Sequence, residues 1–178
     1  MLDEPVAYLD NACVTLKPQS VIDSIQDYYI NTPGCGGRSV HRYGTHVSKT
    51  ISQSRKKLSN FLSSPSVNEI VFTRNATHSL NQIAKGLDWN KGDVVLTTDR
   101  EHNSNLVPWL QLEQEQGIDH RIVRSNQDNT FSLESFEKAC ADAGSKLKMV
   151  SMSHVGNLDG VEIPVKEITR IAKDYDAL

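Results

Sequence analysis

The fold is decided by the stretch Glu69–Leu87, which reads EIVFTRNATHSLNQIAKGL. Its first part, Ile70–Phe72, is a short continuous apolar run, and such a run predicts a strand that is covered on both faces. Apolar residues then recur at helical spacing from Leu80 to Leu87. Asn75 stands between the two patterns, where a helix N-cap belongs. The stretch therefore predicts a buried strand, a tight turn and a helix.

The first turn of this predicted helix contains no acidic residue, since Asn75 is followed by Ala76, Thr77, His78 and Ser79. The free N–H groups and the dipole of a helix N-terminus carry partial positive charge, which a carboxylate in the first turn usually offsets. A turn without its own anion is suited to bind an external one, such as a phosphate. The alternative is an ordinary strand–helix corner that binds nothing.

The composition is that of a soluble globular protein, with 178 residues, 38% hydrophobic and 23% charged. A net charge of −3 gives no reason to expect nucleic acid or an acidic membrane as a partner. No apolar run approaches the ~20 residues of a membrane span, and no signal peptide opens the chain. Cys13, Cys35 and Cys140 are scattered and form no C-x-x-C pair, so we expect no metal site and a reducing cytoplasm.

Residues 1–68 are predicted to form an N-terminal segment with two helices and a Gly-rich loop. The helices are expected at 18–30 and 47–62, the second with Ile51, Leu58 and Leu62 on its inward face. Between them, residues 32–44 contain five Gly and Pro positions and carry His41 and Arg42. Long ordered loops in compact domains are often functional, but a mobile surface loop is an equal alternative.

Strand and helix patterns alternate from residue 69 onward. Beyond the opening stretch, strands are expected at 94–98, 120–125 and 148–153, and helices at 106–116, 133–143 and 165–175. Gly117 is expected to end the first of these helices, and Ser132 to cap the second. This alternation predicts an α/β fold, a mainly parallel sheet with helices on both faces. Ligands bind beyond the carboxyl ends of such strands. We therefore expect the loops 73–77, 99–104 and 153–160 to lie on one edge of the sheet and to hold any site.

These three loops offer groups that suit one kind of ligand. The first offers backbone N–H groups and the Thr77 hydroxyl for a phosphate, the second offers His102, and the third offers His154 and Asn157. An imidazole can stack on a flat ring or move a proton, and an amide can donate to an oxygen on a ring. Together they describe a flat, phosphorylated aromatic cofactor. Taken singly, each has a plain alternative as a structural histidine or a turn residue.

The chain resembles the N-terminal half of the cysteine desulfurases, within the class V aminotransferase group of pyridoxal-phosphate (PLP) enzymes. It is most similar to the branch that serves sulfur mobilisation and selenocysteine lyase activity. The matching stretches are Tyr8–Ala12, Val40–Arg42, Glu69–Arg74, Asn81, Glu101–Trp109 and Ser153–Asn157. The resemblance implies the large-domain fold of PLP-dependent transferases, present here incompletely. Residues 69–178 would then be a partial cofactor-binding domain.

The resemblance also implies roles for single residues. Ala76 and Thr77 match the pair that holds the cofactor phosphate. His102 matches the histidine that stacks on the pyridine ring and helps proton transfer, and Asn157 matches the asparagine near the ring hydroxyl. In this chain Asn75-Ala76-Thr77-His78 stands where family members usually have Gly-Thr-Thr-Glu.

Four further residues match positions around the substrate. Asn11 and Ala12 match a segment that lines the substrate carboxylate. His41 and Arg42 match a loop that reaches the neighbouring subunit's site in family dimers. Cys13 would lie near the site, but it does not match the family's nucleophilic cysteine.

The family also uses an aspartate that pairs with the pyridine nitrogen, a Schiff-base lysine and a catalytic cysteine loop, none of which has a match in this chain. Pyridoxal chemistry needs the acidic partner and the lysine. We therefore expect a fragment that is inactive alone and needs a homodimer or a partner chain supplying the C-terminal half. We also expect apolar surface to be left uncovered at 70–72 or 94–96.

The function implied is desulfuration of L-cysteine, which yields L-alanine and an enzyme-bound persulfide for a sulfur acceptor protein, as in iron–sulfur cluster assembly. One alternative is a non-catalytic module or split subunit that assembles with a partner chain. Another is a different reaction of the same group, such as selenocysteine lyase or kynureninase-like hydrolysis.

Overall fold

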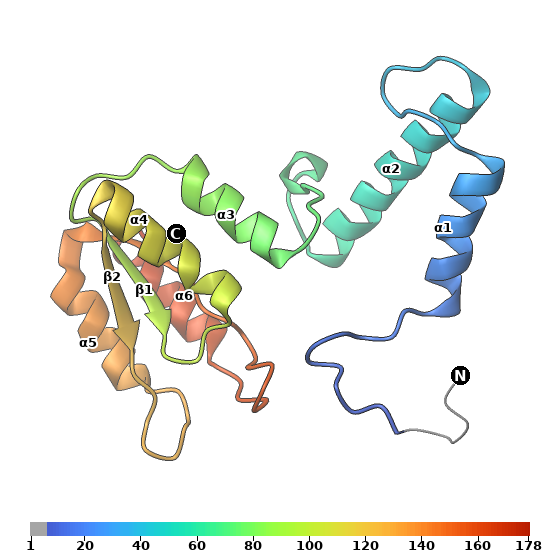
Figure 1. Cartoon of the computed structure of the whole chain (residues 1–178). Coiled ribbons are helices and arrows are strands. Elements are labelled where there is room, and N and C mark those ends of the chain that lie inside the picture. Colours follow the sequence, from blue (N-terminus) through green and yellow to red (C-terminus); the bar gives the residue numbers. More distant parts are fainter. Residues whose placement is uncertain (1–6) are drawn as a thin grey trace. The chain divides into compact units, whose positions relative to one another are not determined.

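The computed structural model describes residues 7–178, so Val6 and the residues before it lie outside the described part. The described chain forms two compact units, one that ends at Phe72 and one that runs from Thr73 to Leu178. Figure 1 shows the helices and strands of each unit. The sequence placed the division slightly earlier, between residues 68 and 69.

The first unit contains α1 (Gln19–Asn31), α2 (Arg42–Phe61) and the short 3₁₀ helix η1 (Val67–Glu69). Both predicted helices form, but α2 begins at Arg42 and not at Val47. The predicted loop therefore ends at His41 instead of Gly44. The reason is a local cap, because the backbone N–H of Gly44 donates to Nδ1 of His41 at 3.4 Å.

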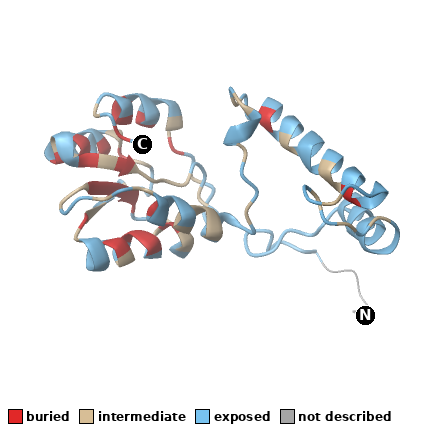
Figure 2. Cartoon of the chain, turned by 90° about the horizontal axis from the view of Figure 1, so that it is seen from above, coloured by how far each residue is buried: buried red, intermediate tan, exposed pale blue. Residues whose placement is uncertain are grey.

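The helices of this unit bury very little. In α1 no residue is buried, and in α2 only Gly44 and Ser59 are. Ile51, Leu58 and Leu62 were predicted to face inward, but they are 41%, 39% and 62% exposed. That prediction was wrong because helical periodicity identifies an apolar face without showing what packs on it. Figure 2 shows both helices almost entirely in the colour of exposed residues.

The strand predicted at 70–72 is not formed. These residues are irregular, and Val71 and Phe72 are 70% and 49% exposed. A strand needs a neighbour to satisfy its backbone, and none of the described strands pairs with this segment. Instead the carbonyl of Ile70 accepts from Nε of Arg55 at 3.0 Å, and the Arg55 guanidinium lies 5.3 Å from the Phe72 ring centre. The expectation of uncovered apolar surface is met here.

The second unit is built on a parallel three-stranded sheet. Its strands are β1 (Val94–Thr98), β2 (Asp119–Val123) and β3 (Leu147–Val150), in the order β2-β1-β3. The central strand β1 is buried along its whole length. Residues 94–96 are therefore fully covered, contrary to the expectation that they could lack cover.

Helices cover both faces of this sheet. They are α3 (Ala76–Gly86), α4 (Val107–Gln116), α5 (Leu133–Ala143) and α6 (Val165–Lys173), with the 3₁₀ helices η2 (Asn103–Asn105) and η3 (Gly144–Lys146). Val94 and Leu96 pack in a core with residues of α5 and α6, and Val95 packs in a second core with residues of α3 and α4. The buried residues gather in this unit in Figure 2. The prediction of an α/β fold with helices on both faces is confirmed.

Short sequence signals set the ends of these helices. Oδ1 of Asn75 accepts the N–H of His78 at 2.9 Å at the start of α3, and Ser132 caps α5 through the N–H of Ser135. Gly117 ends α4 with φ of 72°, in the left-handed region that favours glycine. These three predicted caps are confirmed. Among the helices of residues 7–178, none is long and apolar enough to cross a bilayer.

Candidate functional site

The candidate site lies where the parallel strands of the second unit end. Figure 1 shows the arrowheads of β1 and β2 pointing to the same end of the sheet. The loop after β1 contains His102, and the loop after β3 contains Asn157. Helix α3 packs beside η2, which His102 caps. The predicted strand-end loops of β1 and β3 therefore share one edge, whereas the loop at 73–77 follows an irregular segment.

Glu101 joins the loops after β1 and β3. Its carboxylate accepts from Oγ1 of Thr98 at 2.7 Å and from the side-chain amide of Asn105 at 2.7 Å. It also accepts from the backbone N–H and the hydroxyl of Ser153, at 3.0 and 2.8 Å. A carboxylate that accepts several donors is fixed in orientation. The residue that precedes His102 therefore anchors the start of the Asn157 loop.

The same edge has a second, buried connection. Asn105 is 6% exposed, and its amide nitrogen also donates to the carbonyl of Ser151 at 3.1 Å. Its Oδ1 accepts from the Ser151 hydroxyl at 2.5 Å and from the indole N–H of Trp109 at 3.2 Å. Because each polar group of this buried amide has a partner, the β1 loop is held rigidly against β3.

The N-terminus of α3 offers backbone donors. The first bond within the helix runs from the N–H of Ser79 to the carbonyl of Asn75 at 3.1 Å, so the N–H groups of Ala76 and Thr77 have no acceptor inside the helix. Both residues are exposed, and the first turn contains no acidic residue. This end of α3 can therefore accept an anion from solvent.

His102 is exposed, and one side of its ring is already held. Its Nδ1 accepts the backbone N–H of Ser104 at 3.1 Å and lies 2.8 Å from the Ser104 hydroxyl. Since Nδ1 is an acceptor, the neutral ring carries its proton on Nε2, an assignment that rests on this hydrogen bond. The Nε2 atom and the ring face remain available to a ligand.

Asn157 is exposed and lines a hollow of about 440 Å³ together with Arg100, Glu101 and Asp159. Its loop is a tight turn, in which the N–H of Gly160 donates to the carbonyl of Gly156 at 2.9 Å. A side chain at Gly156 would clash with Asp159, since a Cβ there would lie 2.2 Å from its Oδ1. His154, from the same loop, pairs with Glu162 at 3.3 Å.

Two carboxylates at this edge are held in the charged form. Burial favours the neutral form of Asp99, but hydrogen bonds from the hydroxyl and N–H of Ser125 outweigh it and lower the pKa. The N–H of Val161 lowers the pKa of Asp159, and the guanidinium of Arg100 adds to this effect through an ion pair. The edge therefore carries fixed negative charge, and at Asp159 this charge is paired with Arg100.

The remaining predicted site residues belong to the first unit. Asn11 and Ala12 lie in an exposed turn. His41 caps α2, and Arg42 is its first residue, so both sit at a helix end instead of inside a loop. Whether these four residues contact a substrate stays a prediction.

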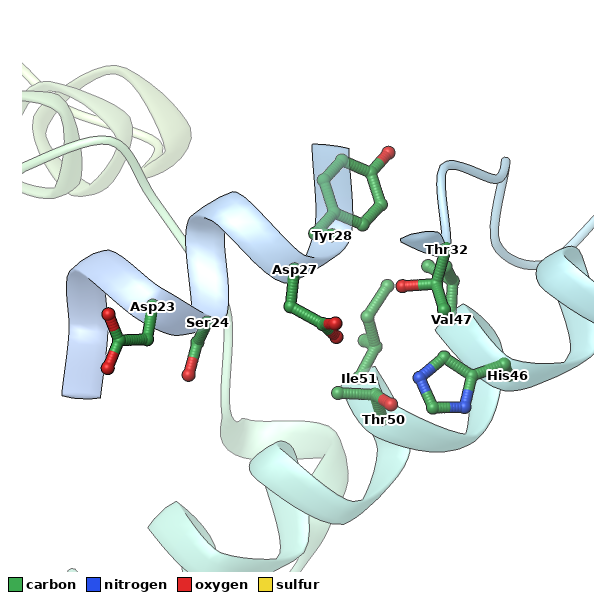
Figure 3. A pocket seen from close by; sticks show the side chains of 9 residues that line it. All are labelled: Asp23, Ser24, Asp27, Tyr28, Thr32, His46, Val47, Thr50 and Ile51. Atoms are coloured by element: carbon green, nitrogen blue, oxygen red, sulfur yellow. The ribbon is translucent and has the colours of Figure 1, made fainter. Parts of the chain in front are cut away.

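A larger hollow of about 720 Å³ lies between α1 and α2 and contains none of the predicted site residues. Figure 3 shows side chains of both helices pointing into it, with Asp27 and Tyr28 from α1 and His46 and Ile51 from α2. It is open because these two helices bury none of their large apolar side chains. Size alone therefore does not mark it as the site of chemistry.

Sequence reasoning assigned no function to Arg100, Glu101, Ser153 or Asp159, although Glu101 and Ser153 were part of the quoted motifs. The available signal was position, because a carboxylate directly after a fully buried strand lies at the ligand-binding edge of a parallel sheet. Glu101 and Ser153 are 52 positions apart in the sequence, and Arg100 and Asp159 are 59 apart. No local sequence pattern reveals pairs at such separations.

Comparison with known proteins gives a consistent result. The family model described as aminotransferase class V matches residues 7–178. A protein of Halalkalibacterium halodurans named "Probable cysteine desulfurase" is 34% identical over 177 residues, which is 98% of this chain and 43% of that protein. The apo structure of a cysteine desulfurase from Thermococcus onnurineus NA1 aligns with a TM-score of 0.86 at 32% identity, over 95% of this chain and 42% of that one.

A more distant structure shares the fold. A C-DES variant with glycine covalently linked to its PLP cofactor aligns with a TM-score of 0.74 at 23% identity. The chain spans 43% of the length of the first two curated relatives that it matches, and 28% of a longer one from Synechococcus elongatus. Pyridoxal phosphate is the cofactor that the family implies, which confirms that prediction at the level of the family. With its family model matched over nearly its whole length, this chain belongs to the class V aminotransferase family.

Proposed function

We propose that this chain supplies the phosphate-binding part of the pyridoxal phosphate site of a cysteine desulfurase. The reaction would take sulfur from L-cysteine and leave L-alanine and an enzyme-bound persulfide. The observation that carries the proposal is the open N-terminus of α3, beside η2 and its cap His102, in a chain of this family. Pyridoxal phosphate, when bound, supplies an electron sink for chemistry at the amino acid.

The described residues fit this cofactor. A phosphate needs donors and partial positive charge, which Ala76, Thr77 and the helix dipole provide. An aromatic ring needs a flat partner, which the exposed imidazole of His102 provides. A ring hydroxyl needs a polar partner, and the exposed amide of Asn157 can serve.

Each residue would then have a distinct task. The N–H groups of Ala76 and Thr77 bind the phosphate and so set where the ring lies. His102 orients the ring and offers its Nε2–H as a hydrogen-bond donor, because Ser104 occupies Nδ1. Asn157 donates its amide to the ring oxygen. Asn11, Ala12, His41 and Arg42 would contact the substrate, its carboxylate in particular.

The activity would require polypeptide beyond these 178 residues, as a homodimer or with a partner chain. The uncovered faces of α1 and α2 support this, since large exposed apolar patches mark interaction sites. We propose the 178-residue chain to be inactive alone, to act in the cytoplasm and to pass sulfur to an acceptor protein for iron–sulfur cluster assembly. The same faces also suit the alternative of a non-catalytic module or split subunit.

The proposal is tested by titrating the 178-residue chain with pyridoxamine 5′-phosphate and following its fluorescence. This probe keeps the ring and the phosphate but has an amine in place of the aldehyde, so it forms no imine with surface lysines. Thr77→Val keeps the backbone N–H but removes the Thr77 hydroxyl, which can donate to the same phosphate from the first turn of α3, so binding should weaken about 5- to 10-fold, equivalent to one hydrogen bond of about 1–1.4 kcal/mol. Thr45→Val, on the exposed surface of α2, is the matched control and should bind as the wild type does. Equal binding by Thr77→Val and the wild type would overturn the proposal.

A further inference from the structure

The loop that carries Asn157 is held at two places by adjacent residues of the loop after β1. Near its start, Ser153 donates its N–H and its hydroxyl to Glu101. At its turn, Asp159 forms an ion pair with the guanidinium of Arg100. Arg100 and Glu101, the two residues before His102, therefore hold the loop that carries Asn157. One segment of the chain thus sets the positions of both His102 and Asn157.

We propose that Arg100 and Glu101 are positioning residues that set Asn157 relative to His102, an inference that rests on the proposed function of this site. Neither side chain needs to touch the cofactor. The two oxygens of Glu101 already accept from four donor groups, which are the Thr98 hydroxyl, the Asn105 amide, and the N–H and hydroxyl of Ser153. Arg100 is likewise engaged on two sides, because its Nε donates to the hydroxyl of Ser125 at 3.2 Å and its Nη1 donates to Asp159.

The turn itself transmits the effect of Arg100 to Asn157. Asp159 has one oxygen on Arg100 and the other on the N–H of Val161 at 3.1 Å. It also packs against Gly156, where a Cβ would clash with it. Asn157 lies between Gly156 and Asp159, so a shift of the Asp159 carboxylate changes the turn that presents the Asn157 amide. Loss of the ion pair should therefore loosen Asn157 without unfolding the sheet.

The phosphate and the ring of the cofactor would be bound by different residues, so the inference predicts different effects on their binding. The phosphate would be held at the N-terminus of α3, which neither Arg100 nor Asp159 contacts within the described residues. Weakening the ion pair should therefore reduce the affinity that comes from contacts with the ring. The affinity that comes from contacts with the phosphate should stay the same. A residue with a merely structural role would reduce both together.

The experiment uses the full 178-residue chain, labelled with ¹⁵N, and two probes, pyridoxamine 5′-phosphate and inorganic phosphate. Asp159→Asn should lower the affinity for pyridoxamine 5′-phosphate about 3- to 10-fold, and change that for inorganic phosphate less than 2-fold. The side-chain amide signal of Asn157 should shift or broaden even without ligand. Arg100→Met should behave in the same way and Arg100→Lys, which keeps the charge, should restore most of the affinity. Asp128→Asn, in the exposed turn before α5, is the control and should change neither affinity.

Glu101→Gln is a second test of the inference. It should lower the affinity for pyridoxamine 5′-phosphate but not that for inorganic phosphate, and it should shift the Asn157 side-chain amide signal more than Asp159→Asn does. Equal losses of both affinities, or an unchanged Asn157 signal in Asp159→Asn, would overturn the positioning inference. If the wild type binds neither probe, the proposed function fails, and the Asn157 signal in the ligand-free variants still decides the inference. The two failures are therefore distinguishable.

Discussion

The two units of the chain have equally clear helical patterns but very different burial. In the unit that ends at Phe72, α1 has no buried residue. In the unit that starts at Thr73, β1 is buried along its whole length and Trp109 is fully inaccessible. The difference shows that the second unit has its own hydrophobic core, whereas the helices of the first are stabilised mostly by local bonds. Local bonds hold short helices only marginally.

The largest effect should come from the core of the second unit. Trp109→Ala removes a fully buried side chain and leaves Asn105 without its indole donor. We expect the free energy of unfolding to fall by about 3–5 kcal/mol. Phe61→Ala, at an 84% exposed residue of α2, should cost less than about 0.5 kcal/mol. Urea denaturation of both variants measures the contrast, and similar losses would show that the two units do not differ as described.

Helix capping offers a smaller test of the same contrast. Oγ of Ser132 accepts the N–H of Ser135 at 3.2 Å at the start of α5, whereas α1 begins after Pro18 with no side-chain cap. Ser132→Ala should therefore lower the free energy of unfolding by about 1 kcal/mol. Ser20→Ala, in the first turn of α1, should leave it within about 0.5 kcal/mol of the wild type. If Ser20→Ala costs more than Ser132→Ala, α1 is better anchored than its exposure indicates.

The dependence of stability on pH probes β2. Burial lowers the pKa of His120, although Glu113 and Asp119 oppose this, and Nε2 of His120 lies 2.9 Å from Oγ1 of Thr97. The pKa of His120 in the folded state is below its unfolded value of about 6.5. At pH values between these two pKa values, the unfolded state therefore binds more protons than the folded state. Stability should thus be complete above pH ~6.5 and fall as the pH decreases through that window.

His120→Gln removes this titration and keeps a polar side chain near Thr97. The slope of stability against pH just below about pH 6.5 should be flatter in the variant. Thermal unfolding at a series of pH values measures it. An unchanged slope would mean that another group titrates in this range.

The sequence predicted what depends on neighbouring residues along the chain. The caps at Asn75 and Ser132, the left-handed Gly117 and the alternation of strands and helices after residue 90 all follow from local chemistry and periodicity. Ile70–Phe72 has the same apolar pattern as Val94–Leu96, yet only the latter forms a strand. The difference is a hydrogen-bonding neighbour on each side, which the sequence of one strand does not encode.

The candidate site was predictable to a similar degree. His102 and Asn157 follow buried strands, and the parallel order of the sheet explains why their loops share an edge. The anchors Glu101–Ser153 and Arg100–Asp159 were missed because they join residues more than 50 positions apart. Such pairs depend on the register of β1 and β3, which only the folded structure supplies.

The central claim is that the cofactor phosphate binds at the N-terminus of α3, in the unit with the packed core. The most direct test is to record ¹H–¹⁵N spectra of the 178-residue chain during a titration with pyridoxamine 5′-phosphate. The account predicts the largest shifts at the backbone N–H groups of Ala76 and Thr77, with smaller ones at His102 and Asn157 and none along α1. Shifts concentrated at the hollow between α1 and α2, or no shift at Ala76 and Thr77 at saturating probe, would contradict it.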